Sequence, residues 1–238
     1  EDKKQNCLSS GLNREGFSLN EIKDIKDNIK RIRQRIEQAA LRSGRNPAEV
    51  ELVAVTKNVP VERIELALKE GITIVGENRV QEALKKQPFL PDNVKWHLIG
   101  HLQRNKVKKV IGKFDLIHSL DSYPLALEIN KQAIKLGQTV DVLIQVNVAG
   151  EESKFGISPE KLTDFILQLA ELPALKIKGL MTIAPYTQNP ETVRPVFRKL
   201  RELREEIAAQ GIPIEYLSMG MTNDFEVAIE EGANLVRI

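Results

Sequence analysis

The stretch Leu52-Val53-Ala54-Val55-Thr56-Lys57 is an apolar run that ends on a lysine. Its small and β-branched residues favour a buried β-strand. If the chain forms a β/α barrel, such a strand carries its last residue to the mouth of that barrel, where a lysine amine can act as a nucleophile. Whether Lys57 is that amine therefore depends on the fold that the remaining chain predicts.

Further apolar runs follow the first, and a helical pattern separates each consecutive pair. Strict alternation of strands and helices predicts a parallel sheet, and eight such units favour a closed (β/α)8 TIM barrel over an open doubly wound sheet. The predicted strands are 52–57, 72–75, 94–100, 114–119, 140–147, 177–183, 216–218 and 235–238. The predicted helices between them are 60–69, 79–86, 103–111, 123–136, 159–171, 192–210 and 224–231.

An extra amphipathic helix precedes the first strand, because apolar residues recur every three or four positions over 18–43. No helix follows the last strand, so either this leading helix covers the gap or the protein continues past Ile238. Residues 1–17 lack both a steady period and the apolar core of a signal peptide, which indicates a flexible leader or a cloning remnant. We expect one barrel domain over 18–238.

The charge balance is close to neutral, at +2 from 35 basic and 33 acidic residues. This argues against a protein that coats nucleic acid or a membrane, and no apolar run approaches a membrane span. The basic run 104–113 has no interleaved aromatic residue that could stack on bases. The only cysteine is Cys7, so no internal disulfide can form and we expect a cytoplasmic protein. The three histidines lie on separate segments, and no metal site is predicted.

The clearest candidate site lies after the last two strands. Ser218-Met219-Gly220-Met221-Thr222 is a short turn that runs directly into a predicted helix. A helix start offers unpaired N–H groups and the positive end of a dipole, which suit a phosphate. Arg237, on the neighbouring strand end, adds a guanidinium. Taken singly, these residues also fit a helix cap and a solvated strand end, but together they predict a phosphate site.

In a closed barrel the first strand adjoins the eighth, so Lys57 faces this phosphate site across a short gap. A ligand with a phosphate at one end and an aldehyde at the other would bridge them, and pyridoxal phosphate (PLP) has that shape. Two other interpretations stay open at this point. Lys57 could be an aldolase-type lysine that forms a Schiff base with a sugar phosphate, or it could only form an ion pair with Glu77.

Several long motifs, in the right order, resemble those of the pyridoxal phosphate homeostasis protein family, the YggS-like proteins. The resemblance covers about residue 20 to the end of the chain. It rests on 53–57, 76–82, 96–106, 154–157, 179–181 and 217–224. It implies a single-domain barrel similar to the N-terminal domain of alanine racemase, with PLP held as a Schiff base on Lys57.

The resemblance also implies which other residues contact the cofactor. The phosphate would be held by the turn at 218–222 and by Arg237, and Lys154 matches a second lysine of the family that could assist cofactor exchange. Apart from Lys57, the implied cofactor-binding residues are Asn78, Asn147, Met181, Ser218, Met219, Gly220, Thr222 and Arg237.

The family has no established turnover, and its members are thought to carry or buffer PLP and to affect amino-acid and keto-acid balance. We expect this chain to act in the same way, without catalytic residues, as a monomer. Its expected partners are PLP and PLP-dependent apo-enzymes, with no nucleic acid or membrane. The alternative is a PLP-dependent amino-acid racemase, which needs a second acid/base. Tyr123, Tyr186 and Tyr216 are not obviously placed for that role.

Overall fold

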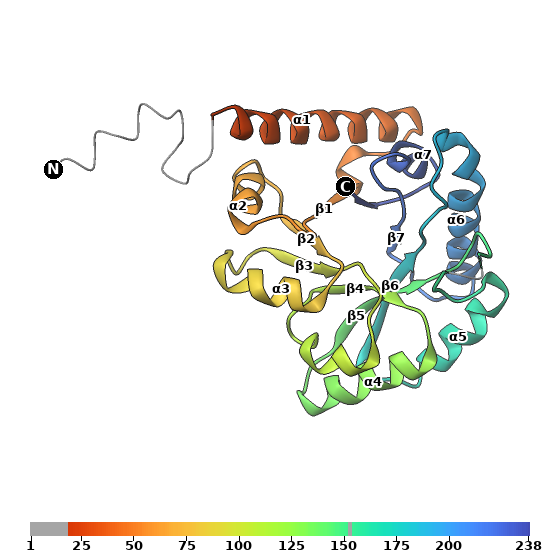
Figure 1. Cartoon of the computed structure of the whole chain (residues 1–238). Coiled ribbons are helices and arrows are strands. Elements are labelled where there is room, and N and C mark those ends of the chain that lie inside the picture. Colours follow the sequence, from red (N-terminus) through yellow and green to blue (C-terminus); the bar gives the residue numbers. More distant parts are fainter. Residues whose placement is uncertain (1–18, 152–153) are drawn as a thin grey trace.

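The strands of this protein close into a barrel with helices around it (Figure 1). The structure, a computed structural model, describes residues 19–151 and 154–238, so the predicted leader 1–17 lies outside the described residues. All the strands are parallel, they follow one another from β1 to β8 around the sheet, and β8 pairs with β1. The (β/α)8 barrel predicted from the alternation of strands and helices is confirmed.

Each element lies close to its predicted range. The strands are β1 Glu51–Val55, β2 Ile74–Glu77, β3 Lys95–Leu98, β4 Leu116–Leu120, β5 Val140–Gln145, β6 Leu175–Met181, β7 Tyr216–Ser218 and β8 Leu235–Arg237. The α-helices are α1 Leu19–Arg42, α2 Val61–Lys69, α3 Val80–Lys86, α4 Tyr123–Lys135, α5 Leu162–Leu169, α6 Arg194–Ala209 and α7 Phe225–Glu230. Short 3₁₀ helices are η1 Pro47–Glu49, η2 Gln87–Phe89, η3 Arg104–Lys109, η4 Pro159–Lys161 and η5 Pro190–Val193.

The leading helix α1 packs against α2 and α7, on either side of the seam between β1 and β8 (Figure 1). Arg35 of α1 forms an ion pair with Glu226 of α7 at 2.8 Å and lies over the ring of Phe225. Arg45, which follows α1, donates to the carbonyls of Ile229 and Ala233 at 2.8 and 2.7 Å. The leading helix thus covers the seam between β1 and β8.

Side chains alternate between the two faces of each strand, so every second residue points into the barrel. The interior is filled by a buried apolar cluster of Val53, Ile74, Leu116, Leu143, Met181 and Leu235. Two residues further along β7 and β8, the same alternation turns Ser218 and Arg237 inward above this cluster. The larger apolar core packs between the strands and the surrounding helices. Polar groups therefore lie at the carboxyl end of an otherwise apolar barrel.

Two segments differ from their predicted structure. The first strand ends at Val55 rather than at Lys57, because Thr56 begins a turn in which Asn58 has a φ of +58°. The segment 103–111, predicted as a helix, forms the shorter 3₁₀ helix η3 over Arg104–Lys109. Val107 and Val110 are both buried there, and their spacing of three residues suits the three-residue repeat of a 3₁₀ helix.

Candidate functional site

The predicted site residues gather at one rim of the barrel, because parallel strands bring all their carboxyl ends together. Met181, Ser218 and Arg237 are the last residues of β6, β7 and β8. Others follow a strand end within one or two residues, namely Lys57, Asn78 and Asn147. The rim is thus the place where a ligand could contact most of them at once.

Arg237 is a buried cation on this rim, with 5% of its surface exposed. Its guanidinium donates to Ser218 Oγ at 2.5 Å and to the carbonyl of Thr182 at 3.0 Å. Burial lowers its pKa to about 10, with Asp224 opposing the shift, so it stays charged at neutral pH. Within the described residues no carboxylate forms an ion pair with it. Since a buried charge without a counterion is costly, this arginine is suited to an anionic ligand.

Two buried histidines continue the hydrogen bonds of Ser218 across the barrel. Ser218 Oγ lies 2.9 Å from His118 Nδ1, and His118 Nε2 lies 3.0 Å from His97 Nδ1. Burial, with Lys95 adding to it, lowers the pKa of His97 to about 4. Burial, His97 and Arg237 lower the pKa of His118 well below its usual range. Both rings are therefore neutral near pH 7, and His118 is the hydrogen-bond partner of His97.

The direction of these hydrogen bonds follows from the guanidinium, which can only donate. Ser218 Oγ accepts from Arg237, so its own proton can go to Nδ1 of His118. His118 then donates through Nε2–H to His97. In this arrangement the hydroxyl of Ser218 and the Nε2–H of His118 each have an acceptor. Protein partners thereby occupy the hydroxyl of Ser218, and it holds Arg237 in place.

The turn after β7 presents free backbone N–H groups beside Arg237. In the part of the chain that the structure describes, no acceptor is found for the N–H groups of Gly220, Thr222 and Asn223, while the carbonyl of Gly220 accepts from Arg237 N at 3.1 Å. Gly220 has a φ of +94°, and a Cβ added there would lie 2.6 Å from the Cβ of Ala228. Only glycine fits this close turn, whose donors and neighbouring cation form a cradle for an anion.

Two other residues of the turn do not act as free donors. The N–H of Met219, predicted as a phosphate ligand, donates to the carbonyl of Leu235 at 3.2 Å, so it belongs to the ladder between β7 and β8. The carboxylate of Asp224 accepts from the N–H of Met221 at 2.6 Å, and burial raises the pKa of Asp224. The free N–H groups of this turn therefore begin at Gly220.

Lys57 lies on the turn that follows β1, and its side chain is exposed. No hydrogen bond or ion pair of its ammonium is found with the described residues. The N–H of Val59 closes the turn on the carbonyl of Thr56 at 3.0 Å. The N–H of Val55 donates to the carbonyl of Ile238 at 2.7 Å, so Lys57 lies two residues beyond a direct contact between β1 and the end of β8. A free amine and a buried guanidinium thus belong to adjacent strands.

Glu77 is bound to Lys86 and not to Lys57. Its Oε1 accepts from Lys86 Nζ and from Thr56 Oγ1, each at 2.7 Å. Lys86 also contacts Glu82 at 2.7 Å. The interpretation of Lys57 as only the ion-pair partner of Glu77 is therefore wrong. Sequence analysis missed Lys86, although its spacing of four residues from Glu82 on a helix was a signal for at least one of these contacts.

The remaining predicted residues occupy other parts of the rim. Asn78 is exposed directly after β2. Asn147 donates its side-chain amide to the carbonyl of Glu151 at 2.9 Å, and Lys154 forms an ion pair with the carboxylate of the same residue at 2.7 Å. Met181 is fully buried in the interior cluster. Asn78 is thus open to a ligand, whereas Asn147 and Lys154 are bound to their own loop and Met181 lies beneath the rim.

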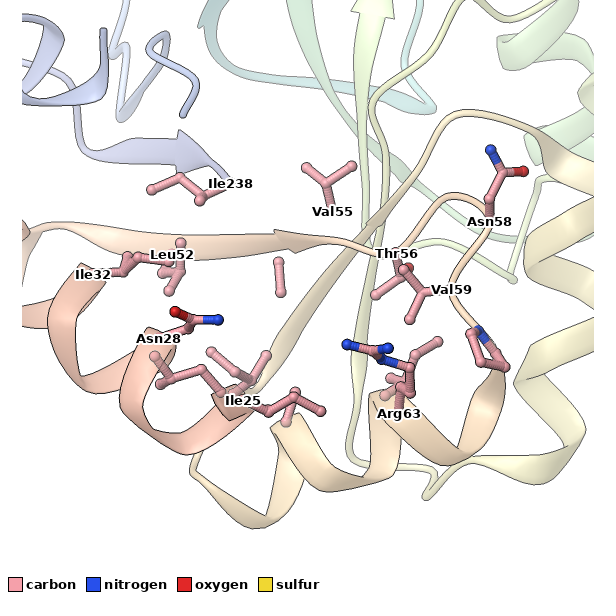
Figure 2. A pocket seen from close by; sticks show the side chains of 16 residues that line it. Ile25, Asn28, Ile32, Leu52, Val55, Thr56, Asn58, Val59, Arg63 and Ile238 are labelled. Atoms are coloured by element: carbon pink, nitrogen blue, oxygen red, sulfur yellow. The ribbon is translucent and has the colours of Figure 1, made fainter. Parts of the chain in front are cut away.

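An apolar cavity lies outside the barrel, between β1, α1 and α2 (Figure 2). Its volume is about 430 Å³, and Ile25 and Ile32 of α1 and Leu52 of β1 are among the residues that line it. Thr56 and Val59 form one edge of it, so the turn that carries Lys57 lies between this cavity and the rim. Leu52, Ala54 and Val55 of β1 line it together with residues of α1, of α2 and of the turn after β1.

Metal-ligating side chains do not cluster in the described part of the chain, where no group of three His, Cys, Asp or Glu residues could hold a metal ion. The described helices also differ from membrane spans, because none is both long and apolar enough to cross a bilayer. The cradle beside Arg237 and the amine of Lys57 are the features of the rim that are open to a ligand.

Known proteins agree with the architecture and with the resemblance seen in the motifs. Residues 21–238 match the family described as the alanine racemase N-terminal domain. The pyridoxal phosphate homeostasis protein of Aquifex aeolicus (strain VF5) is 51% identical over 214 residues, which are 89% of this chain and 94% of that protein. The solved structure of an unknown protein from Bifidobacterium adolescentis is 36% identical, with a TM-score of 0.88 over 95% of this chain and 97% of that one.

A further solved structure contains the cofactor that the motifs imply. PipY of Synechococcus elongatus PCC7942, with PLP bound, is 37% identical to this chain, with a TM-score of 0.73. The match covers 87% of this chain and 96% of PipY. The lengths, the fold and the motifs agree across these relatives, and the chain belongs to the pyridoxal phosphate homeostasis protein family.

Proposed function

We propose that this protein binds PLP at the rim, as a Schiff base on Lys57, and serves in PLP homeostasis as a carrier rather than as an enzyme. The observation that carries the proposal is the buried guanidinium of Arg237, which has no carboxylate partner among the described residues and lies beside free N–H groups. The structure of PipY with PLP bound, from a relative of similar length, supports the choice of ligand.

The residues present fit the phosphate of such a ligand. A phosphate needs several donors and a positive field, and the N–H groups of Gly220, Thr222 and Asn223 supply donors where Arg237 supplies charge. Ser218 acts behind the cradle, because its hydroxyl holds the guanidinium and not the ligand. The absence of a Cβ at Gly220 keeps the turn tight enough for its N–H groups to converge.

Lys57 fits the aldehyde end of the same ligand. Its amine is exposed and lies on the turn after β1, the strand that pairs with β8, where Val53 is opposite Arg237. When bound, PLP supplies an aldehyde carbon that reacts with a primary amine. The Lys57 nitrogen attacks this carbon, a C=N bond forms, and one water molecule leaves with the former aldehyde oxygen. Asn78, exposed at the next strand end, is placed to contact the ring.

The described residues favour a carrier over a racemase, the alternative that the name of the fold family suggests. A racemase needs a second acid/base near the cofactor. Tyr216 packs against the interior cluster, and burial raises its pKa to about 12. Tyr186 lies exposed in the loop after β6, and Tyr123 begins α4. His97 is neutral and 5% exposed. Among the described residues, no hydrogen bond or ion pair joins any of these side chains to Lys57 or Arg237.

The proposal extends to the context of the protein. We infer that the protein is cytoplasmic and monomeric and that it passes PLP to PLP-dependent apo-enzymes. Lys154 would assist release, because it lies on the loop after β5 and exchanges its bond to Glu151 at little cost on an exposed surface. Sedimentation of the purified protein checks the monomer, and transfer of PLP to an apo-enzyme, with and without Lys154→Ala, checks the carrier role.

The binding claim is tested by the visible absorbance of a Schiff base after addition of PLP to wild type, Lys57→Ala and Lys95→Ala. Lys95 is an exposed lysine at the opposite end of the barrel and serves as a matched control. We expect the band in wild type and in Lys95→Ala and its loss in Lys57→Ala. Pyridoxal, which lacks the phosphate, should give a much weaker band. Turnover of L- or D-amino acids at ordinary enzymatic rates would instead support the racemase.

A further inference from the structure

Three charged side chains surround the peptide bonds of Lys57 on the outer side of the barrel. Lys86 Nζ donates to the carbonyl of Thr56, to Glu77 Oε1 and to Glu82 Oε1, each at 2.7 Å. An ammonium has three N–H donors, so all the donors of Lys86 are used. Glu77 is fully buried, and 10% of the Lys86 side chain is exposed. We call Glu77, Glu82 and Lys86 the charged clamp.

The charged clamp holds both peptide units that flank Lys57. The carbonyl of Thr56, which accepts from Lys86, belongs to the peptide bond that precedes Lys57. The N–H of Asn58, which belongs to the peptide bond that follows it, donates to Glu82 Oε1 at 2.5 Å. The hydroxyl of Thr56 is held as well, by Glu77 Oε1 at 2.7 Å. The backbone on each side of the amine is therefore fixed by a buried or partly buried charge.

The turn needs such support because its backbone is unfavourable. Asn58 has a φ of +58°, a left-handed conformation that the structure must hold in place for a residue other than glycine. The bond from Val59 N to the carbonyl of Thr56 closes the turn but leaves the N–H of Asn58 to Glu82. Without the charged clamp, the carbonyl of Thr56 and the N–H of Asn58 would each lose a charge-assisted hydrogen bond.

Stability alone does not explain the charged clamp. Buried ion pairs are often no more stabilising than apolar residues of the same volume. Glu77 Oε2 is buried and has no hydrogen-bond partner among the described residues, so this carboxylate lacks part of the usual compensation for burial. The charged clamp instead fixes the orientation of the turn that carries Lys57. Reaction geometry is sensitive to such direction, because a displacement of about 1 Å can slow a reaction by about 10²-fold.

We propose that Lys86, with Glu77 and Glu82, is a positioning group that holds the turn 56–58 so that the Lys57 amine meets the aldehyde of a ligand anchored at Arg237. This inference rests on the proposed function, since it assigns a role to Lys57 as the reacting amine. It predicts that loss of the Lys86 charge slows formation of the Schiff base without weakening the phosphate site, which lies on β7 and β8.

The test compares Lys86→Met with Lys85→Met. Both lysines lie in the last turn of α3, but Lys85 is exposed, so its replacement controls for loss of a charge from this helix. The first measurement is the rate of Schiff-base formation with PLP, and the second is the affinity for pyridoxine phosphate, which has an alcohol in place of the aldehyde. We expect Lys86→Met to lower the rate at least tenfold and to leave the pyridoxine phosphate affinity within twofold of wild type, with Lys85→Met unchanged.

Hydrogen exchange of the Asn58 amide gives a third measurement that needs no ligand. Lys86→Met should speed this exchange at least tenfold, because Glu82 then loses the ammonium that holds it against Asn58. A wild-type rate of Schiff-base formation in Lys86→Met, an equal loss of pyridoxine phosphate affinity, or unchanged exchange at Asn58 would each overturn the positioning role. Absence of any Schiff base in wild type would overturn the proposed function instead, and the exchange result would still decide whether the charged clamp holds the turn.

Discussion

The two sides of the rim are built in different ways. On the side of β7 and β8, Arg237 is buried within the sheet, and hydrogen bonds through Ser218 and His118 to His97 hold it from below. On the side of β1, Lys57 is exposed on a turn, and the charged clamp holds that turn from outside the barrel. The anchor is therefore part of the barrel sheet, whereas the reactive amine lies on a turn after β1 that side chains of β2 and α3 hold.

This difference fits a protein that must both hold and release its ligand. A buried cation with preformed donors supplies affinity that does not depend on covalent chemistry. An exposed amine forms a bond that water or a second amine can reverse. Changes on the β7–β8 side should therefore alter non-covalent binding, while changes on the β1 side should alter the rate of bond formation.

Acid should destabilise the fold through His97, which ends the series of hydrogen bonds behind Arg237. The pKa of His97 is lowered from its ordinary value of 6.5 to about 4 by burial and Lys95, so between these values the unfolded chain binds a proton that the folded protein does not. The free energy of unfolding should thus fall as the pH drops from 6.5 towards 4, by on the order of 3 kcal/mol for this group. Chemical denaturation across this range measures it.

The matched variant for this prediction is His97→Gln, which retains a hydrogen-bonding group for His118 but does not titrate. Its free energy of unfolding should depend less steeply on pH between 6.5 and 4. The difference in free energy of unfolding between wild type and variant should therefore become smaller as the pH falls. Carboxylates such as Glu226, whose pKa is lowered by its hydrogen bond from Arg35, titrate in both proteins and cancel. Parallel pH profiles for the two proteins would show that His97 is not the group that responds.

Replacement of the anchor should separate stability from binding. Arg237→Met removes the buried charge, so the free energy of unfolding without ligand should stay within about 1 kcal/mol of wild type. Affinity for pyridoxine phosphate should fall by about tenfold to hundredfold, because charge-assisted hydrogen bonds are lost. Isothermal titration calorimetry measures the affinity. Arg35→Met, which removes a half-buried cation from α1, should leave binding unchanged, and equal losses in both variants would argue against a specific anchor.

A side chain at Gly220 should destabilise the protein, because the turn there is tight. Gly220→Ala places a Cβ 2.6 Å from the Cβ of Ala228 at a φ of +94°, so we expect a loss of stability of about 2 kcal/mol and weaker pyridoxine phosphate binding. Gly137 is the control, because its φ is +62° and an added Cβ meets nothing within 4 Å. Gly137→Ala should cost about 1 kcal/mol and leave binding unchanged. Thermal unfolding of the two variants compares the costs, and equal effects would mean that packing around Gly220 is unimportant.

The barrel could be predicted from the sequence because the patterns that indicate its strands and helices are local. Each strand is an apolar run and each helix a periodic one, and their strict alternation leaves few topologies. The rim followed from the same reasoning, since every strand end in a parallel barrel points the same way. Lys57 and Arg237 could therefore be placed on one rim before any contact was known.

Contacts between distant segments could not be read in this way. Sequence spacing does not reveal that His97, His118 and Ser218 meet inside the barrel, because this depends on the strand register. The partner of Glu77 was missed for a similar reason: Lys57 and Lys86 both belong to segments next to β2, and only the packing of α3 selects Lys86. The use of the Met219 N–H by the β7–β8 ladder also depends on register.

The central claim is that Lys57 forms the Schiff base with PLP. Borohydride reduces such a bond irreversibly, and peptide mass mapping then locates the modified lysine. The account predicts that, after incubation with PLP at a stoichiometric concentration, the label is found on the peptide that contains Lys57 and on no other peptide at comparable yield. A label on Lys154 in place of Lys57, or no label in wild type, would contradict it.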